Sequence, residues 1–321
     1  MLNSFVNQLQ LLRLVIVLGL VSGTKAAASW HYPTPGPDGS LQEEDHWGGT
    51  CDTGRRQSPI DINSKAAVRG AYPEFDFDGY DDALTGASYI NNGHTVQLNR
   101  GADSEIAIKG GGLRGKYIFE QMHFHWSSEH TLNGERYGLE AHLVHRHSSY
   151  GSVNEAAVQK AGIAVLAVLF RVTDQSNEVI AQILNDTNSI RTEPDRSIPL
   201  QSKLELEDLL PKNRDRYFRY EGSLTTPVCA ESVVWTVFPE TVPISLDQVE
   251  QFKTFRDDEN HELILNYRPV KPLNLRVLVL VDDVDPLEAS TGAAPRSFPT
   301  AISLLSMLPL VGRLLFAHKI Q

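Results

Sequence analysis

Residues 120–131 read EQMHFHWSSEHT and place three histidines within one short stretch. On a β-strand, alternate side chains point to opposite faces, so His123 and His125 share one face. Gln121 lies on that same face, whereas the residues between the histidines are apolar and suit a core. Two imidazoles at this spacing on a rigid strand can direct their nitrogens to one point, as zinc requires of its ligands. The stretch therefore predicts a strand with one metal-binding face and one apolar face.

A third metal ligand must come from another segment. Residues 138–150, GLEAHLVHRHSSY, contain three further histidines and have the pattern of a strand. If a hairpin places this segment beside the first, either His142 or the pair His145 and His147 faces the candidate site, because His142 lies on the opposite face from the other two. Spacing alone leaves this choice open, and histidines clustered on a hairpin that bind no metal are the alternative.

Two polar residues favour His142 as the third ligand. Gln121 stands two positions before His123, and Glu140 stands two positions before His142. Each can accept the ring N–H that points away from the metal, which orients the imidazole and raises its basicity.

Strand patterns dominate the rest of the chain. Segments rich in β-branched and aromatic residues recur between turn signals, and they cover residues 88–99, 104–110, 116–126, 139–147, 162–172, 217–223, 231–238 and 275–283. Residues 177–190 and 245–255 have helical patterns, with Ser245 placed to cap the second helix. Because strands and helices do not alternate, we predict a mainly β (α+β) fold with a single large, twisted, mostly antiparallel sheet and short surface helices.

Composition limits the function classes. The chain has 321 residues, of which 41% are hydrophobic, enough for a substantial core. Its formal net charge is -11, which disfavours binding to nucleic acid because phosphate contacts need clustered Lys and Arg. A small-molecule partner fits this composition better. Nothing between residues 29 and 285 resembles a linker or a repeat, so we predict one domain there.

The N-terminus has the pattern of a targeting segment. Residues 1–28 contain Arg13, then the apolar run LVIVLGLVSG, then small residues. This order predicts a cleaved secretory signal peptide, and a membrane anchor is the alternative.

The C-terminus has a different pattern. Residues 286–297 form a linker with small residues from Ser290 to Ala293, a possible site of lipid attachment, and residues 298–321 form an apolar tail. This order predicts a tail that is removed when a GPI-type anchor is attached to the outer face of the plasma membrane. The alternatives are a permanent span, which Arg313 disfavours, and an apolar end with no further role.

Two features fit a secreted protein. Cys51 and Cys229 are the two cysteines of the chain, and an oxidising compartment favours a disulfide between them. Asn185 begins an Asn-Asp-Thr sequon for glycosylation.

The sequence does not complete three other functional motifs: a phosphate loop, a zinc-protease motif and a serine-hydrolase elbow. Residues 110–116, GGGLRGK, have phosphate-loop spacing, but Tyr117 stands where the motif needs Ser or Thr. HELIL at His261 lacks the second histidine of a zinc protease, and the chain has no GxSxG elbow.

Several strings together resemble the α-class carbonic anhydrases, in order and in spacing, over about residues 29–282. They are WxY at Trp30 and Tyr32, RQSPIDI at 56–62, NNGHT at 91–95, QMHFHW at 121–126, SEHT at 128–131, EAHLVH at 140–145, SLTTP at 223–227 and NYRPVKPLN at 266–274. The cysteine pair is similar to the disulfide of the secreted or membrane-anchored branch. The resemblance implies that residues 29–285 form the catalytic domain.

The resemblance implies a Zn²⁺ ion held by His123, His125 and His142, which leaves His145 and His147 outside the site. It also implies that the three ligands donate to Gln121, to the backbone of Asn266 and to Glu140.

The resemblance also implies catalytic roles. The Thr225 hydroxyl donates to Glu129 and orients a zinc-bound hydroxide, and His94 moves protons to solvent. The proton-transfer network consists of Tyr32, Asn92 and Gln97, and the wall that binds carbon dioxide consists of Val144, Val165, Leu224, Thr226, Val233 and Trp235. Val228 and Tyr267 depart from the usual family residues near the site, where Pro and Trp are common.

The implied activity is the reversible hydration of carbon dioxide to bicarbonate and a proton, in the extracellular balance of pH and bicarbonate. The alternative function is a carbonic-anhydrase-like binding domain at the cell surface without turnover. Such relatives lack one or more zinc histidines, and all three are present here.

Overall fold

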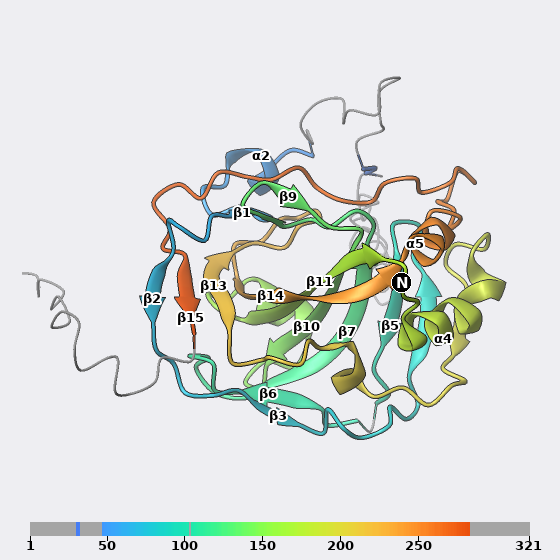
Figure 1. The fold of residues 1–321 in the computed structure, drawn as a ribbon, viewed down its shortest axis with the longest axis horizontal. Coiled ribbons are helices and arrows are strands. Elements are labelled where there is room, and N and C mark those ends of the chain that lie inside the picture. The colour runs from blue at the N-terminus through green and yellow to red at the C-terminus, as the bar shows by residue number, and fades with distance from the viewer. Residues whose placement is uncertain (1–29, 33–46, 103, 283–321) are drawn as a thin grey trace, which may run out of the picture. The chain divides into compact units, whose positions relative to one another are not determined.

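The strands predicted from the histidine-rich stretches pair in the middle of a large sheet. In the computed structural model, which describes residues 30–32, 47–102 and 104–282, β7 (Tyr117–His125) and β10 (Leu139–His147) are antiparallel neighbours. They belong to a twelve-stranded sheet whose strands run in the order β12-β4-β5-β7-β10-β11-β14-β13-β15-β2 (Figure 1). The other strands of this path are β12 (Ser197–Pro199), β4 (Ser88–Asn91), β5 (Val96–Asn99), β11 (Ile163–Thr173), β14 (Val233–Ser245), β13 (Tyr217–Gly222), β15 (Val279–Val281) and β2 (Val68–Gly70).

Most neighbouring strands of this sheet are antiparallel. The exceptions are the parallel pairs β11–β14 and β15–β2. Off the main path, β6 (Ala107–Lys109) pairs with β7 and with β3 (Asp76–Asp78). The predicted mainly β fold with one large, mostly antiparallel sheet is thereby confirmed.

A second, small sheet was not predicted. It contains β1 (Asp61–Ile62), β8 (Thr131–Leu132) and β9 (Glu135–Arg136), each only two residues long. Two residues are too few for an alternating pattern, so the sequence carries no periodic signal for these strands.

The sheet separates two apolar clusters, and β11 contributes to both. Ala164, Leu166, Val168 and Phe170 pack in one cluster, and Ile163, Val165, Ala167 and Leu169 pack in the other. A strand buried on both faces reads as a continuous apolar run, as residues 163–170 do. Met122 and Phe124 of β7 belong to the first cluster, so His123 and His125, which alternate with them, face the side of the second.

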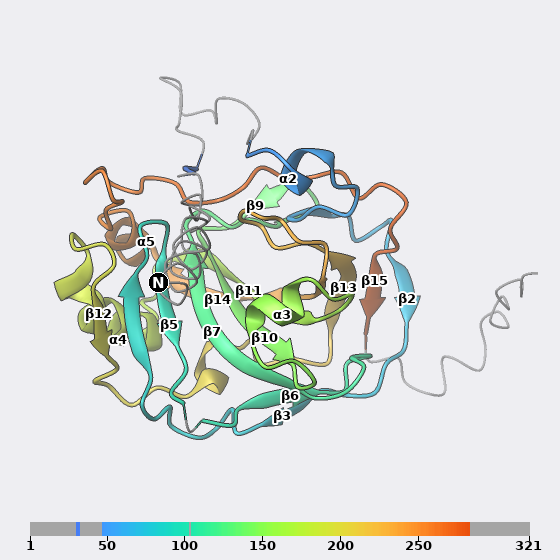
Figure 2. The same ribbon diagram turned by 180° about the vertical axis from the view of Figure 1, so that it is seen from behind.

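The helices are short, and polar side chains cap the N-termini of α3, α4 and α5. α2 (Thr50–Thr53), α3 (Val153–Ala157), α4 (Glu178–Asp186) and α5 (Leu246–Phe252) accompany the 3₁₀ turns η1 (Thr187–Ile190) and η2 (Leu206–Leu209). Figure 2 shows α3 against β10 and β11, and α4 lies beside α5. Ser245 caps α5 as predicted, because its side chain accepts from the Gln248 backbone N–H. Gln248 also joins the two helices, since its side chain bonds both the N–H and the carbonyl of Asn177.

The predicted disulfide is confirmed. Cys51, in α2, and Cys229 lie 178 positions apart, and their Cα atoms are 5.0 Å from each other. Asn185 is exposed near the end of α4.

Several predictions concern residues outside the described ranges. The signal peptide at 1–28, the linker at 286–297 and the tail at 298–321 all lie there. Among the described residues, no helix is long and apolar enough to cross a membrane.

Candidate metal centre

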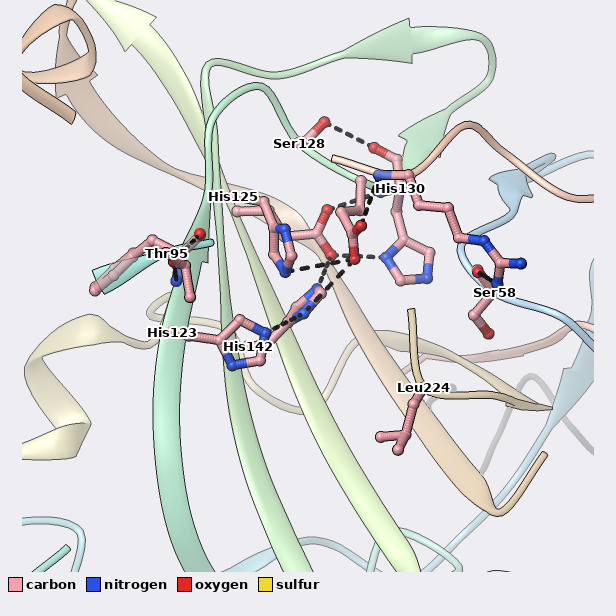
Figure 3. A network of polar contacts seen from close by, with 12 residues as sticks. Ser58, Thr95, His123, His125, Ser128, His130, His142 and Leu224 are labelled. Carbon is pink, nitrogen blue, oxygen red and sulfur yellow. Dashed lines mark hydrogen bonds and ion pairs between the residues drawn. The ribbon is translucent and has the colours of Figure 1, made fainter. Parts of the chain in front are cut away.

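Strand register brings three histidines together. His142 of β10 stands opposite His123 of β7, and Glu140 stands opposite His125. One ring nitrogen from each of the three histidines lies within 4.8 Å of the others, and Figure 3 shows the rings pointing toward one another. The His142 Nδ1 and His123 Nε2 atoms are only 3.3 Å apart.

Each histidine uses its outer nitrogen to donate a hydrogen bond. His123 Nδ1 lies 2.9 Å from Gln121 Oε1, His125 Nδ1 lies 2.7 Å from the Asn266 carbonyl, and His142 Nε2 lies 2.7 Å from Glu140 Oε1. Because these partners are acceptors, the outer nitrogens carry the protons. In neutral rings the inner nitrogens then present lone pairs, the form in which imidazole binds a metal.

Burial keeps two of these rings neutral. Desolvation lowers the pKa of His123 well below its usual value, and the neighbouring His125 and His142 lower it further. Desolvation also lowers the pKa of His125, although the nearby Glu129 carboxylate opposes the change.

The inner atoms fit a cation. His125 Nε2 and Glu129 Oε2 are buried 3.4 Å apart, and neither has a hydrogen-bond partner in the described part of the chain. Both atoms present electron pairs, since His125 already donates through Nδ1. Burying such atoms without a partner is costly, and a metal ion among the three imidazoles would offset that cost.

The other two histidines of β10 lie outside this group. A register irregularity follows Val144, and His145 packs against Phe119 and Tyr80 in the cluster on the opposite face. Its Nε2 lies 2.7 Å from the Tyr80 hydroxyl and its Nδ1 lies 3.3 Å from the Ala164 carbonyl, so a neutral ring satisfies both nitrogens. Burial lowers the pKa of His145 to about 3. His147 Nε2 lies 2.8 Å from the Arg114 carbonyl at the edge of the protein.

Glu129 is fully buried beside the histidines. Its Oε1 accepts from the Arg268 backbone N–H at 2.9 Å. Thr225 is also buried, but no hydrogen bond joins its hydroxyl to Glu129 within the described ranges, and Oε2 instead lies against His125 Nε2. The expected Thr225–Glu129 hydrogen bond is therefore absent from this structure.

His130 is a site residue to which the sequence analysis assigned no role. It is fully buried, with Nδ1 2.6 Å from Glu140 Oε1 and Nε2 2.6 Å from the Tyr220 hydroxyl, which in turn lies 2.9 Å from Ser58 Oγ. Burial favours a protonated Glu140, but His130 and His142 outweigh it and hold the pKa of this carboxyl well below its usual value. The signal was present, since His130 is the third histidine of the opening stretch, but alternation does not extend past the end of β7.

The predicted proton-transfer residues lie beside the histidines. The His94 ring stacks on Trp30 with 3.8 Å between centroids, and burial lowers its pKa while Asp258 opposes the shift. The Tyr32 ring lies 6.3 Å from that of His94 and 6.5 Å from that of His125. Gln97 pairs with His123 across β5 and β7, and it accepts from Asn92 at 3.4 Å.

The predicted apolar wall also lies on this side of the sheet. Val144, Val165 and Trp235 are neighbours across β10, β11 and β14, and the Trp235 ring lies 4.8 Å from that of His142. Val233 belongs to the same cluster, Leu224 packs against it, and Thr226 is half-buried in the same loop.

The sequence is similar to those of known proteins. The family model for eukaryotic-type carbonic anhydrase matches residues 42–281. The chain is 38% identical to carbonic anhydrase 4 of Oryctolagus cuniculus over 259 residues, covering 77% of this chain and 82% of that protein. It is 35% identical to carbonic anhydrase 6 of Bos taurus, covering 81% and 82%, and 33% identical to carbonic anhydrase 15 of Mus musculus, covering 92% and 94%. The chain therefore belongs to the eukaryotic-type carbonic anhydrase family, zinc-dependent enzymes that catalyse the reversible hydration of carbon dioxide to bicarbonate and a proton.

Proposed function

We propose that His123, His125 and His142 hold the catalytic zinc ion of this enzyme. The observation that carries the proposal is the pairing of the ring nitrogens: each outer nitrogen meets an acceptor, and each inner nitrogen is directed at the other two. Three protein ligands with a fourth open position are typical of catalytic zinc. When bound, zinc lowers the pKa of water in contact with it and supplies a hydroxide nucleophile at neutral pH, the established chemistry of this family.

The chain's own residues provide a surface for carbon dioxide and orient the oxygen lone pairs that face it. Val144, Val165, Leu224, Val233 and Trp235 offer an apolar surface for a neutral gas, with Thr226 at its edge. Thr225 donates its hydroxyl proton to Glu129 Oε2 in the active enzyme, which leaves only oxygen lone pairs facing the site. The buried Oε2 atom, which has no hydrogen-bond partner in the described ranges, supports this role.

His94 carries the proton from the site to solvent. Its half-buried ring lies at the side of the site, and burial lowers the pKa of this ring from its ordinary value. Imidazole is the side chain suited both to accept and to release protons in the physiological pH range. Tyr32, Asn92 and Gln97 order the water through which protons travel from the metal site.

A comparison of two histidine variants tests the metal proposal. We expect His142→Ala to lose most of its zinc, measured as metal per chain by atomic emission, and to slow carbon dioxide hydration by at least about a hundredfold. His147→Ala removes a histidine of the same strand from the opposite face, and should keep both zinc and rate. If His142→Ala retained its zinc and its rate, the assignment would be wrong.

We further propose that the enzyme works outside the cell as residues 29–285. Residues 1–28 direct secretion, attachment of a GPI-type lipid occurs within 286–297, and residues 298–321 are removed. The disulfide supports an oxidising compartment. A phospholipase specific for such anchors should release the enzyme from intact cells, and a tag placed after residue 321 should be missing from the mature protein. Resistance to the phospholipase together with a retained tag would point to a span.

The sequon supports a glycan on Asn185, whose side chain is exposed. Protein from secreting cells should lose mass on treatment with an N-glycanase, whereas Asn185→Gln should not.

A further inference from the structure

A cavity of about 560 Å³ lies apart from the candidate metal centre. Its walls come from β13, β14, the start of β7 and the segment that leads into β15, and none of the three candidate ligands lines it. β13 and β15 lie side by side in both views (Figures 1 and 2). The volume is within the range of small-molecule sites.

The charge of this cavity is opposite to that of the chain. The whole protein has a formal net charge of -11. The cavity nevertheless gathers five cationic side chains and a single carboxylate, that of Glu221; the cations are Arg56, Arg114, Lys160, Arg219 and Arg276. A positive cavity in a negatively charged protein attracts anions, although the molecule as a whole repels them.

Two of these guanidinium groups are positioned without being neutralised. Arg219 donates to the carbonyls of Gly111 and Gly112, and Arg276 donates to those of Leu273, Pro272 and Glu221. Neither forms an ion pair with a carboxylate in the described ranges. Burial lowers the pKa of both groups, as expected for cations without an anionic partner.

The single carboxylate is shared between two cations at the rim. Glu221 lies 3.1 Å from the Arg56 guanidinium and 3.9 Å from the Lys160 ammonium. Arg114 is exposed, and its side chain forms no ion pair within the described part of the chain. Arg56 also lies 3.6 Å from the Glu231 carboxylate, which stands outside the cavity lining. The positive charges of Arg114, Arg219 and Arg276 have no carboxylate partner in the described ranges and remain uncompensated.

Apolar groups stand beside these cations. Leu275 is fully exposed and Val277 is 59% exposed, although both line the cavity. The Tyr72 ring lies 5.1 Å from the Arg219 guanidinium. Exposed aliphatic side chains next to guanidinium groups suit a ligand with an apolar body and an anionic head.

We propose that this cavity binds a small organic anion, whose phosphate, sulfate or carboxylate head meets Arg219, Arg276 and Arg114, with Lys160 adding positive charge at the rim, while its apolar body rests on Leu275 and Val277. Guanidinium groups recognise such heads with paired N–H donors. The site is separate from the proposed zinc site, so its test does not depend on catalysis.

Calorimetric titration of the zinc-loaded enzyme with phenyl phosphate at low ionic strength tests the proposal. We expect saturable binding that the double variant Arg114→Gln/Lys160→Gln weakens by about tenfold or more. The matched control Lys65→Gln/Lys212→Gln removes the same charge from exposed lysines outside the cavity and should change the dissociation constant by less than about twofold. Equal binding by the two double variants would overturn the proposal, because it would place phenyl phosphate elsewhere.

Two further probes test the apolar half of the ligand. Phenyl phosphate should bind more tightly than inorganic phosphate or phenol, and Leu275→Ser should weaken phenyl phosphate without affecting inorganic phosphate. If inorganic phosphate bound as tightly as phenyl phosphate, the apolar contribution would be disproved. Thermal unfolding of each variant checks that a loss of binding does not come from a loss of fold.

Discussion

At the residue scale, the partners of each ring nitrogen decide which histidines of β10 are available to a metal. His142 donates outward to Glu140 and directs its other nitrogen at His123. His145, three positions later, has both nitrogens satisfied inside an apolar cluster. A histidine whose two nitrogens are both hydrogen-bonded within a core has no lone pair left for a ligand.

The buried His145 predicts a pH-dependent stability. The unfolded chain protonates this ring near pH 6.5, whereas the folded chain does so only near pH 3. The free energy of unfolding should therefore fall as pH decreases from 6.5 toward 3, with a contribution from this ring of at most about 1.4 kcal/mol per pH unit. Urea unfolding measured between pH 7 and pH 5 gives the free energy of unfolding at each pH. This free energy should fall less steeply with decreasing pH for His145→Gln than for the wild type. The same dependence on pH in both proteins would contradict the proposed contribution of His145.

His94 predicts a buffer-dependent turnover. We expect His94→Ala to slow turnover by about tenfold or more in dilute buffer, because the imidazole that accepts the proton is lost. Added imidazole should restore part of the rate in stopped-flow measurements. His261→Ala, which removes an exposed histidine from the nearby loop, is the control and should keep its turnover. A rate that imidazole does not raise would remove the shuttle role.

At the element scale, the pairing of β7 with β10 builds the site. The register sets His142 opposite His123, and a shift of one residue would turn His142 to the other face. The irregularity after Val144 changes the pairing only beyond the site, between His145 and Phe119. The regular part of the ladder therefore carries the candidate ligands.

The cap of α5 predicts a stability change without a catalytic one. Ser245 and Gln248 form a reciprocal capping box. Ser245→Ala should lower the free energy of unfolding by about 1 kcal/mol, because the Gln248 backbone N–H loses its acceptor. Chemical denaturation checks this value against Ser149→Ala, an exposed serine in a turn that should change stability little. Equal stability of the two variants would show that the cap contributes nothing.

At the scale of the whole molecule, the disulfide joins two segments that are distant in the sequence. Cys51 precedes the first strand, whereas Cys229 follows the Thr225 loop. In the chain-entropy model a link between such distant residues constrains the unfolded state strongly. Replacing both cysteines by serine should lower the free energy of unfolding by about 2–5 kcal/mol.

A reducing agent provides the matched control for the disulfide prediction. It should destabilise the wild type in thermal unfolding, and it should leave the double serine variant unchanged. Destabilisation of both proteins to the same extent would mean that the reductant acts elsewhere.

The sequence by itself determined most strands of the large sheet, the polar face of β7, the cysteine pair and the cap at Ser245, because alternation and capping are local patterns. It also reduced the third ligand to two sets of histidines. Residues distant in the sequence decided the rest: the Asn266 carbonyl that orients His125, the Glu140–His130–Tyr220 contacts, and the missing hydrogen bond between Thr225 and Glu129. The cationic cavity also depends on tertiary structure, since its arginines come from separate segments that only sheet pairing brings together. Local patterns specify which face a side chain occupies, but the atom that it meets there depends on how the distant segments pack.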